Sequence, residues 1–182
     1  MPLTAIPFKA PPPFELPPVI TNEIGALSFE QAAQHALELL LESGCGDAFL
    51  TVRLDSGKLV PGPGLGAGPD ADQALAETGA ALTGGATVNF LDEAIAANQP
   101  LLLMGELAAD ETVAFPDAFK RYLLRGAQRA PIGFLYVFPL DDTAGQARGA
   151  LAIHRGLTAG PLNHDQPAIA HALARALGER LD

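Results

Sequence analysis

Residues 132–182 are the most informative about the fold, because signals for strand, turn, strand and helix follow one another there. A dense run of apolar and aromatic residues occupies 132–140, turn-forming residues occupy 141–146, and a second apolar run occupies 149–154. From Ile169 to Leu181, apolar residues recur at helical spacing. This stretch therefore predicts a β-hairpin followed by a C-terminal helix.

Composition places the chain among globular proteins and limits the kinds of partner that it can be expected to bind. Its 182 residues suit one domain with a tail, and 48% of them are hydrophobic while 18% are charged. With 21 acidic and 11 basic residues, the formal net charge of −10 opposes binding to nucleic-acid phosphates and to anionic membranes. We therefore expect neither nucleic acid nor a membrane as a partner.

Cysteine use and the first residues indicate where the protein resides. The single Cys45 excludes an internal disulfide, and the chain starts with neither a basic segment nor a long apolar one. No aliphatic run approaches the roughly 20 residues that span a bilayer. These features predict a cytoplasmic protein.

Residues 1–24 differ in composition from the rest. Prolines occupy positions 7, 11, 12, 13, 17 and 18, and proline lacks the N–H group that helices and sheets use. The sequence therefore predicts a Pro-rich tail or arm in extended polyproline geometry, followed by a single domain over 25–182. Such an arm either docks on a partner or acts as a semi-rigid linker.

Capping signals and periodicity predict the helices. Ser28 and Gln31 match a capping box, in which each side chain bonds the backbone of the other residue. An apolar stripe follows and ends near Gly44, a residue type that closes helices. A first helix is therefore expected over 28–43. Further helices are expected over 72–82, 89–97 and 116–125.

Strand signals precede and separate these helices. Residues 48–54 alternate and predict a strand, which a tight turn joins to a short return strand at 58–61. The glycine- and proline-rich stretch 60–68 predicts a mobile loop. Residues 101–103 form one further expected strand after a proline.

The order of these elements predicts an α/β fold of the α+β type, in which an antiparallel sheet has helices on both faces. The N- and C-terminal helices are expected to pack together on one face. Alternation along the last strand puts Leu151 and Ile153 on an aliphatic side, which the terminal helices would cover. Ala150, Ala152 and His154 lie opposite, and the two alanines leave volume for a neighbouring group or a ligand.

Several of these segments resemble the GAF domain family. Phe138-Pro139-Leu140, Arg148-Gly149-Ala150-Leu151 and the helix over 163–181 correspond to its final strand, turn, strand and helix, and 94–103 also looks like its pattern. The resemblance extends from about Ser28 to Leu181. It implies a sensory or regulatory domain, often dimeric through its terminal helices, with a pocket between the sheet and the inner helices.

A small-molecule pocket of this kind needs apolar walls and a few polar groups. Within that pocket Arg53 would select an anionic ligand. The candidate residues on the sheet are Thr51, Arg53, Tyr136, Ala152 and His154, and those on the covering segment are Phe115, Phe119 and Tyr122. The sequence names neither the ligand nor the output partner.

The sequence is compatible with three functions. The first is a non-catalytic regulatory domain in signal transduction that binds a small molecule or a partner protein. The second is a structural module that forms a homodimer through helices 28–43 and 164–181, with its pocket filled by side chains. The third is an enzyme on the same scaffold.

The sequence argues against the enzyme and predicts no cofactor or metal. A lone Cys45 cannot form the intramolecular disulfide that a reductase cycle needs. The histidines are scattered and lack the spacing of a metal site. The glycine-rich stretch 60–68 fails as a dinucleotide loop because Pro63 removes an N–H group from the expected phosphate cradle.

Overall fold

The computed structural model describes residues 6–7, 14–66, 90–104, 132–156 and 159–182. The helices predicted over 72–82 and 116–125 lie outside the described residues. None of the helices within the described ranges is long and apolar enough to cross a lipid bilayer.

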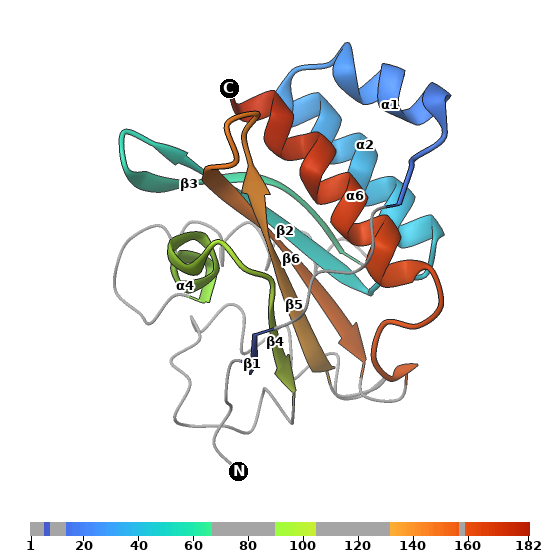
Figure 1. Ribbon diagram of the computed structural model, residues 1–182. Helices are drawn as coiled ribbons and strands as arrows, with labels where there is room; N and C mark the ends of the chain where they lie inside the picture. The colour runs from blue at the N-terminus through green and yellow to red at the C-terminus, as the bar shows by residue number, and fades with distance from the viewer. Residues whose placement is uncertain (1–5, 8–13, 67–89, 105–131, 157–158) are drawn as a thin grey trace.

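The described residues form an antiparallel sheet in the order β1-β4-β5-β6-β2-β3 (Figure 1). Each pair of neighbouring strands is antiparallel, and β5 pairs with β6 along most of its length. The predicted antiparallel sheet and the predicted hairpin are thus both confirmed. The strands are β1 (Ile6–Pro7), β2 (Ala48–Asp55), β3 (Lys58–Gly66), β4 (Leu101–Met104), β5 (Ile132–Asp141) and β6 (Ala147–Gly156).

Helices cover both faces of this sheet, as the sequence predicted. Helices α2 (Phe29–Glu42) and α6 (Gln166–Gly178) lie side by side on one face, and α4 (Phe90–Ala97) lies on the other (Figure 1). We call these the terminal-helix face and the α4 face. Leu151 and Ile153 belong to the core beneath the terminal helices, so the expected aliphatic side is confirmed.

Side-chain bonds at both ends hold the antiparallel pair α2 and α6 together. Gln166 Nε2 donates to the carbonyl of Ser43 at 3.2 Å, where α2 ends and α6 begins. At the opposite end, Arg180 in the short helix η2 (Glu179–Leu181) donates from Nε to the carbonyl of Leu27 at 3.1 Å. Carbonyls at a helix end lack intrahelical partners, so the Gln166 bond also satisfies part of the end of α2.

The predicted capping box begins α2. The N–H group of Gln31 donates to Ser28 Oγ at 3.3 Å, and the N–H group of Ser28 donates to Gln31 Oε1 at 3.4 Å. Two backbone donors that a helix start leaves unpaired are satisfied in this way. The start of the helix is therefore confirmed to the residue.

The end of the N-terminal arm is helical, which corrects the prediction of extended geometry as far as residue 21. Helix α1 (Pro18–Gly25) packs on α2 and α6, and Ile24 is only 1% exposed within their core. Glu23 also lies 3.0 Å from His35 Nε2 on α2. Pro18 occupies the first turn of α1, where a helix needs no N–H donor, so its sequence is compatible with this helix.

Strand β3 continues to Gly66, although the sequence predicted a loop from residue 60. Pro61 pairs with Val52 and Leu65 with Phe49 on either side of an irregularity in the register. Because β3 is the last strand in the order, only one of its sides must donate to a neighbour, and proline is tolerated on such a strand. Residues 67–68 lie outside the described ranges.

Glycine allows α6 to approach the end of β5 very closely. A Cβ atom at Gly178 would overlap the backbone carbonyl and amide of Asp141. We predict that Gly178→Ala destabilises the protein by about 2 kcal/mol, because this contact is with backbone that cannot rotate away. Urea unfolding monitored by circular dichroism measures this change.

The matched control is Gly25→Ala at the end of α1, where an added Cβ meets nothing within 4 Å. This variant should change the free energy of unfolding by no more than about 0.5 kcal/mol, or stabilise the protein slightly. Equal effects of the two substitutions would contradict the close packing of α6 on β5.

Candidate functional site

The predicted pocket residues divide between the two faces of the sheet, so the structure does not bring them together. In the β2/β6 register, Thr51 lies opposite Leu151 and Arg53 opposite Gly149, which puts both on the terminal-helix face. Tyr136 lies opposite Ile153 and shares this face. Ala152 and His154 lie on the α4 face. Phe115, Phe119 and Tyr122 lie outside the described residues.

The polar groups on the terminal-helix face bond to the protein itself. Thr51 is fully buried, and its hydroxyl donates to the carbonyl of Pro63 at 2.6 Å. Arg53 Nε lies 3.5 Å from Glu30 Oε1, and both side chains are partly exposed. The hydroxyl of Tyr136 accepts a hydrogen bond from the N–H group of Leu162 at 3.0 Å. These contacts fix the sheet and the loop before α6 in place.

The α4 face is apolar and contains two of the smallest side chains. In the register of β6, Ala150 lies opposite Val52, and Ala152 lies opposite Leu50 and Val137. All five side chains are buried in one cluster with Leu91 and Ala94 of α4. Because an alanine side chain extends less far from the sheet than valine or leucine, the side chains of β6 reach less far towards α4 than those of its neighbours.

His154 ends the row of small side chains on the α4 face. Its ring is 2% exposed, and Nδ1 lies 3.2 Å from the carbonyl of Ala48. Because a carbonyl can only accept, this contact assigns the proton to Nδ1. Burial lowers the pKa of His154 to about 4, and the bond to Ala48 offsets only part of that effect. The imidazole is therefore neutral at pH 7.

Arg155 is a buried cation that sequence reasoning missed. It is 5% exposed, and its guanidinium donates to the carbonyls of Gly44 at 2.6 Å and Gly160 at 2.9 Å. Gly44 follows the end of α2, where the helix dipole favours a positive charge. The available signal was a charged residue directly after the apolar run 149–154. Its contacts assign Arg155 to holding α2, β6 and the loop before α6 together.

The thiol of Cys45 is buried and unsuited to nucleophilic chemistry. Burial raises its pKa to about 11, although the nearby Arg155 charge acts in the opposite direction. The thiolate, which is the reactive form, is therefore scarce at neutral pH. Across the described ranges, no cluster of histidine, cysteine or acidic side chains has the arrangement of a metal site.

Comparison with solved structures identifies the fold. The GAF domain/HD domain protein from Geobacter sulfurreducens has a TM-score of 0.58 at 12% identity, covering 88% of this chain and 95% of that one. The GAF domain of a phosphoenolpyruvate-protein phosphotransferase from Coxiella burnetii has a TM-score of 0.59 at 16% identity, covering 90% and 88%. The nlh2 GAF domain of A. aeolicus in an inactive state has a TM-score of 0.58 at 13% identity, covering 90% and 93%.

The chain therefore has the GAF fold, as the resemblance in its sequence implied. No family model and no curated protein matches the sequence. At identities this low, the likeness extends to the fold and leaves the function to be argued from the residues.

The buried His154 predicts a loss of stability in mild acid. The folded protein keeps the ring neutral to about pH 4, whereas the unfolded chain binds a proton below about pH 6.5. Stability from this residue is thus present above about pH 6.5 and is lost as the pH falls towards 4, up to an order of 3 kcal/mol. We expect His154→Asn, which keeps an N–H donor near Ala48, to weaken this pH dependence in urea unfolding.

His164→Asn provides the matched control, because His164 is exposed and has a positive φ angle that asparagine tolerates. This variant should keep the pH dependence of the unmodified protein. If His154→Asn also left the dependence unchanged between pH 7 and 4.5, the assignment of a buried neutral imidazole would be wrong.

Proposed function

We propose that this chain is a non-catalytic regulatory domain that binds a small molecule on the α4 face of its sheet. The solved structures with which it shares its fold are GAF domains, which supports a sensory or regulatory role. The observation that carries the proposal is the pair Ala150 and Ala152 beneath α4, flanked by larger apolar side chains. A role in cytoplasmic signal transduction remains the expectation from the sequence.

The chemistry of this face favours a ligand with an apolar body. Its described side chains are mainly aliphatic, and the His154 imidazole is neutral. Arg53, which suggested an anionic ligand, lies on the opposite face beside Glu30. The reason for expecting an anion is therefore lost for the α4 face.

Ala152→Leu tests the proposed ligand site, because the added side chain would occupy the space above β6. We expect a compound in a panel of apolar and aromatic small molecules to raise the melting temperature of the unmodified protein, and we expect Ala152→Leu to abolish this shift. Thermal shift assays and native mass spectrometry of the purified protein measure both effects.

The control is Ala172→Leu, which adds the same volume to a half-buried position on α6, away from the α4 face. It should retain the thermal shift. If no panel member stabilises the unmodified protein and no co-purified mass is found, the ligand proposal fails. A loss of about 1–3 kcal/mol in Ala152→Leu without ligand would indicate that protein side chains already fill this face.

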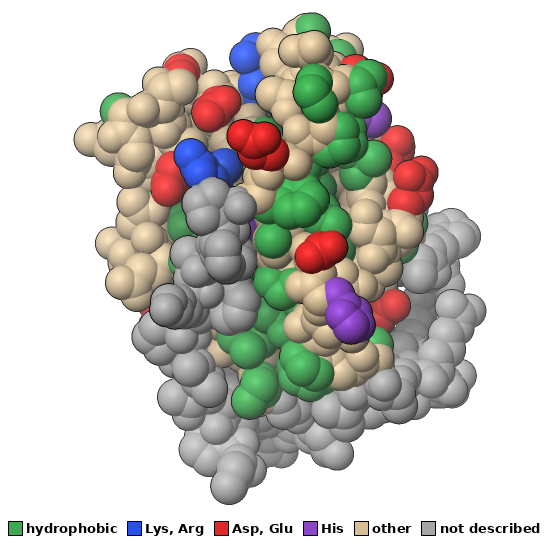
Figure 2. Space-filling model, turned by 45° about the vertical axis from the view of Figure 1, so that its right-hand side comes forward, with side chains coloured by type: hydrophobic (Ala, Val, Ile, Leu, Met, Phe, Trp, Pro, Cys, Tyr) green, Lys and Arg blue, Asp and Glu red, His purple; other side chains and the backbone are tan. Residues whose placement is uncertain are grey.

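A hydrophobic band on the terminal-helix side favours a second candidate function, a structural module that dimerises through α2 and α6. Figure 2 shows hydrophobic side chains gathered along this side with acidic ones beside them. Val19 of α1 is 61% exposed and Leu41 of α2 is 39% exposed. Half-buried alanines at 168, 172 and 176 form a row on α6. Helices with small and apolar outer residues can approach another copy closely.

Leu41→Glu tests the homodimer, because a charge on α2 would oppose burial of this band. If the protein dimerises as proposed, sedimentation velocity should give this variant a dimer dissociation constant at least tenfold higher than that of the unmodified chain. Met104→Glu is the control, since Met104 is 46% exposed but lies on β4. A protein that is monomeric at all concentrations, or a dimer that Leu41→Glu leaves intact, would contradict this arrangement.

A further inference from the structure

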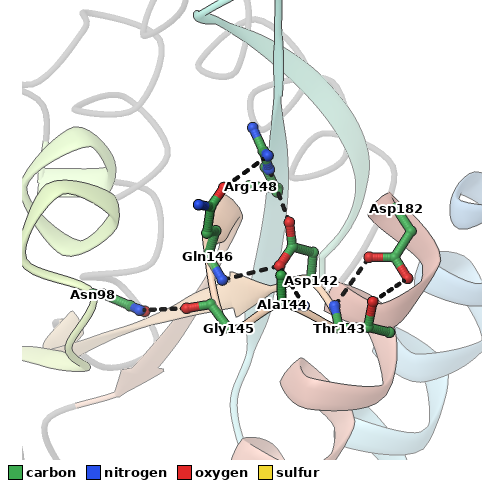
Figure 3. A network of polar contacts seen from close by, with 8 residues as sticks. All are labelled: Asn98, Asp142, Thr143, Ala144, Gly145, Gln146, Arg148 and Asp182. Atoms are coloured by element: carbon green, nitrogen blue, oxygen red, sulfur yellow. Dashed lines mark hydrogen bonds and ion pairs between the residues drawn. The ribbon is translucent and has the colours of Figure 1, made fainter.

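The turn between β5 and β6 is held as one compact unit by Asp142 (Figure 3). Its Oδ1 atom accepts hydrogen bonds from the N–H groups of Ala144 and Gln146, each at 2.9 Å, and its Oδ2 atom accepts one from Arg148 Nε at 3.0 Å. The bond from Gln146, followed by that from Arg148, lowers the pKa of the Asp142 carboxyl. The carboxylate therefore stays charged at neutral pH and keeps the turn in one shape.

One side of this turn is bonded to the end of α4. Asn98 directly follows α4 with a φ angle of +48°, a conformation in which asparagine often ends a helix. Its N–H group donates to the carbonyl of Ile95 at 3.2 Å, which holds it to the helix. Its side-chain Nδ2 donates to the carbonyl of Gly145 at 3.0 Å. A displacement of α4 would therefore pull on the turn.

The other side of the turn is bonded to the segment that ends α6. Thr143 donates to the side-chain carboxylate of Asp182 twice, from its N–H group at 3.0 Å and from its hydroxyl at 2.8 Å. The backbone of Gly178 also lies directly against that of Asp141, with no room for a Cβ atom between them. A displacement of the turn would therefore reach the last turn of α6 and η2.

These contacts connect two helices that lie on opposite faces of the sheet (Figure 1). We propose that the β5–β6 turn couples α4 to the C-terminal end of α6, so that a molecule bound on the α4 face changes the stability of that end. The regulatory part of this inference rests on the proposed function, because a molecule bound on the α4 face is what would displace α4. The coupling itself belongs to the protein without ligand.

Breaking the bond on the α4 side should loosen the end of α6, which it does not touch. We expect Asn98→Gly to accelerate amide hydrogen exchange about three- to tenfold at Thr143 and over 177–181, the range for the loss of one intramolecular hydrogen bond. Glycine accepts the positive φ angle, so the substitution removes the amide without straining the backbone. Hydrogen exchange of the full chain, measured by mass spectrometry and NMR, resolves these amides.

Two further variants control this experiment. Gln99→Ala removes an exposed amide from the neighbouring position and should leave exchange over 177–181 unchanged. Asn98→Asp replaces the donor by an acceptor and should reproduce the effect of Asn98→Gly. If the Asn98 variants accelerate exchange only at the turn, or equally in every segment, the proposed coupling is wrong.

A double-mutant cycle between Asn98→Gly and Asp182→Ala gives an independent test. Asn98→Gly removes the bond between the turn and the end of α4, and Asp182→Ala removes the bonds between the turn and the residue that follows η2. The two residues contact the turn and not each other. If the turn transmits strain, the first break already loosens it, so the double variant should change the unfolding constant by less than the product of the single changes. A product within experimental error would overturn the coupling.

The exchange experiments need no ligand, which separates the two proposals. If the Asn98 variants accelerate exchange over 177–181 but the protein binds no ligand, the proposed function is wrong and the coupling between the helices stands. If a ligand binds on the α4 face but the variants leave exchange over 177–181 unchanged, the proposed function stands and the coupling is wrong.

Discussion

The register of β6 against β5 and β2 decides which side chains fill each face of the sheet. It directs Leu151 and Ile153 towards α2 and α6 and leaves Ala150 and Ala152 beneath α4. Because side chains alternate along a strand, a slip of one residue would exchange these two sets. The large side chains would then lie under α4 and the alanines under the terminal helices, so the core beneath the terminal helices would lose much of its filling.

Hydrogen bonds from a few side chains to backbone groups at the ends of helices and loops hold this arrangement. Arg155 and Gln166 both donate to carbonyls at the end of α2, while Tyr136 holds the loop that leads into α6. Each contact joins residues distant in the sequence. The terminal-helix face is thus held together at both ends by hydrogen bonds and filled between them by aliphatic side chains.

Local signals predicted the fold well, because the physics that sets them is local. The capping box at Ser28 and the hairpin of β5 and β6 are both written in consecutive residues, and both are confirmed. The sequence alone could not assign the candidate pocket residues to one face, because alternation along β2 does not show which of its sides is continuous with which side of β6. Thr51 and Arg53 were grouped with Ala152, although pairing across the sheet puts them on opposite faces. Helix α1 was missed because the prolines before it suggested extended backbone. The burial of Ile24 depends on packing against α2 and α6, which no local sequence signal shows.

We propose that the α4 face accepts a small molecule above Ala150 and Ala152. A high-resolution crystal structure of the purified protein, solved with its most stabilising panel compound, can test this proposal. We expect density for that compound in contact with both alanine methyl groups beneath α4. Density elsewhere, or an α4 face closed by the protein's own side chains, would contradict it.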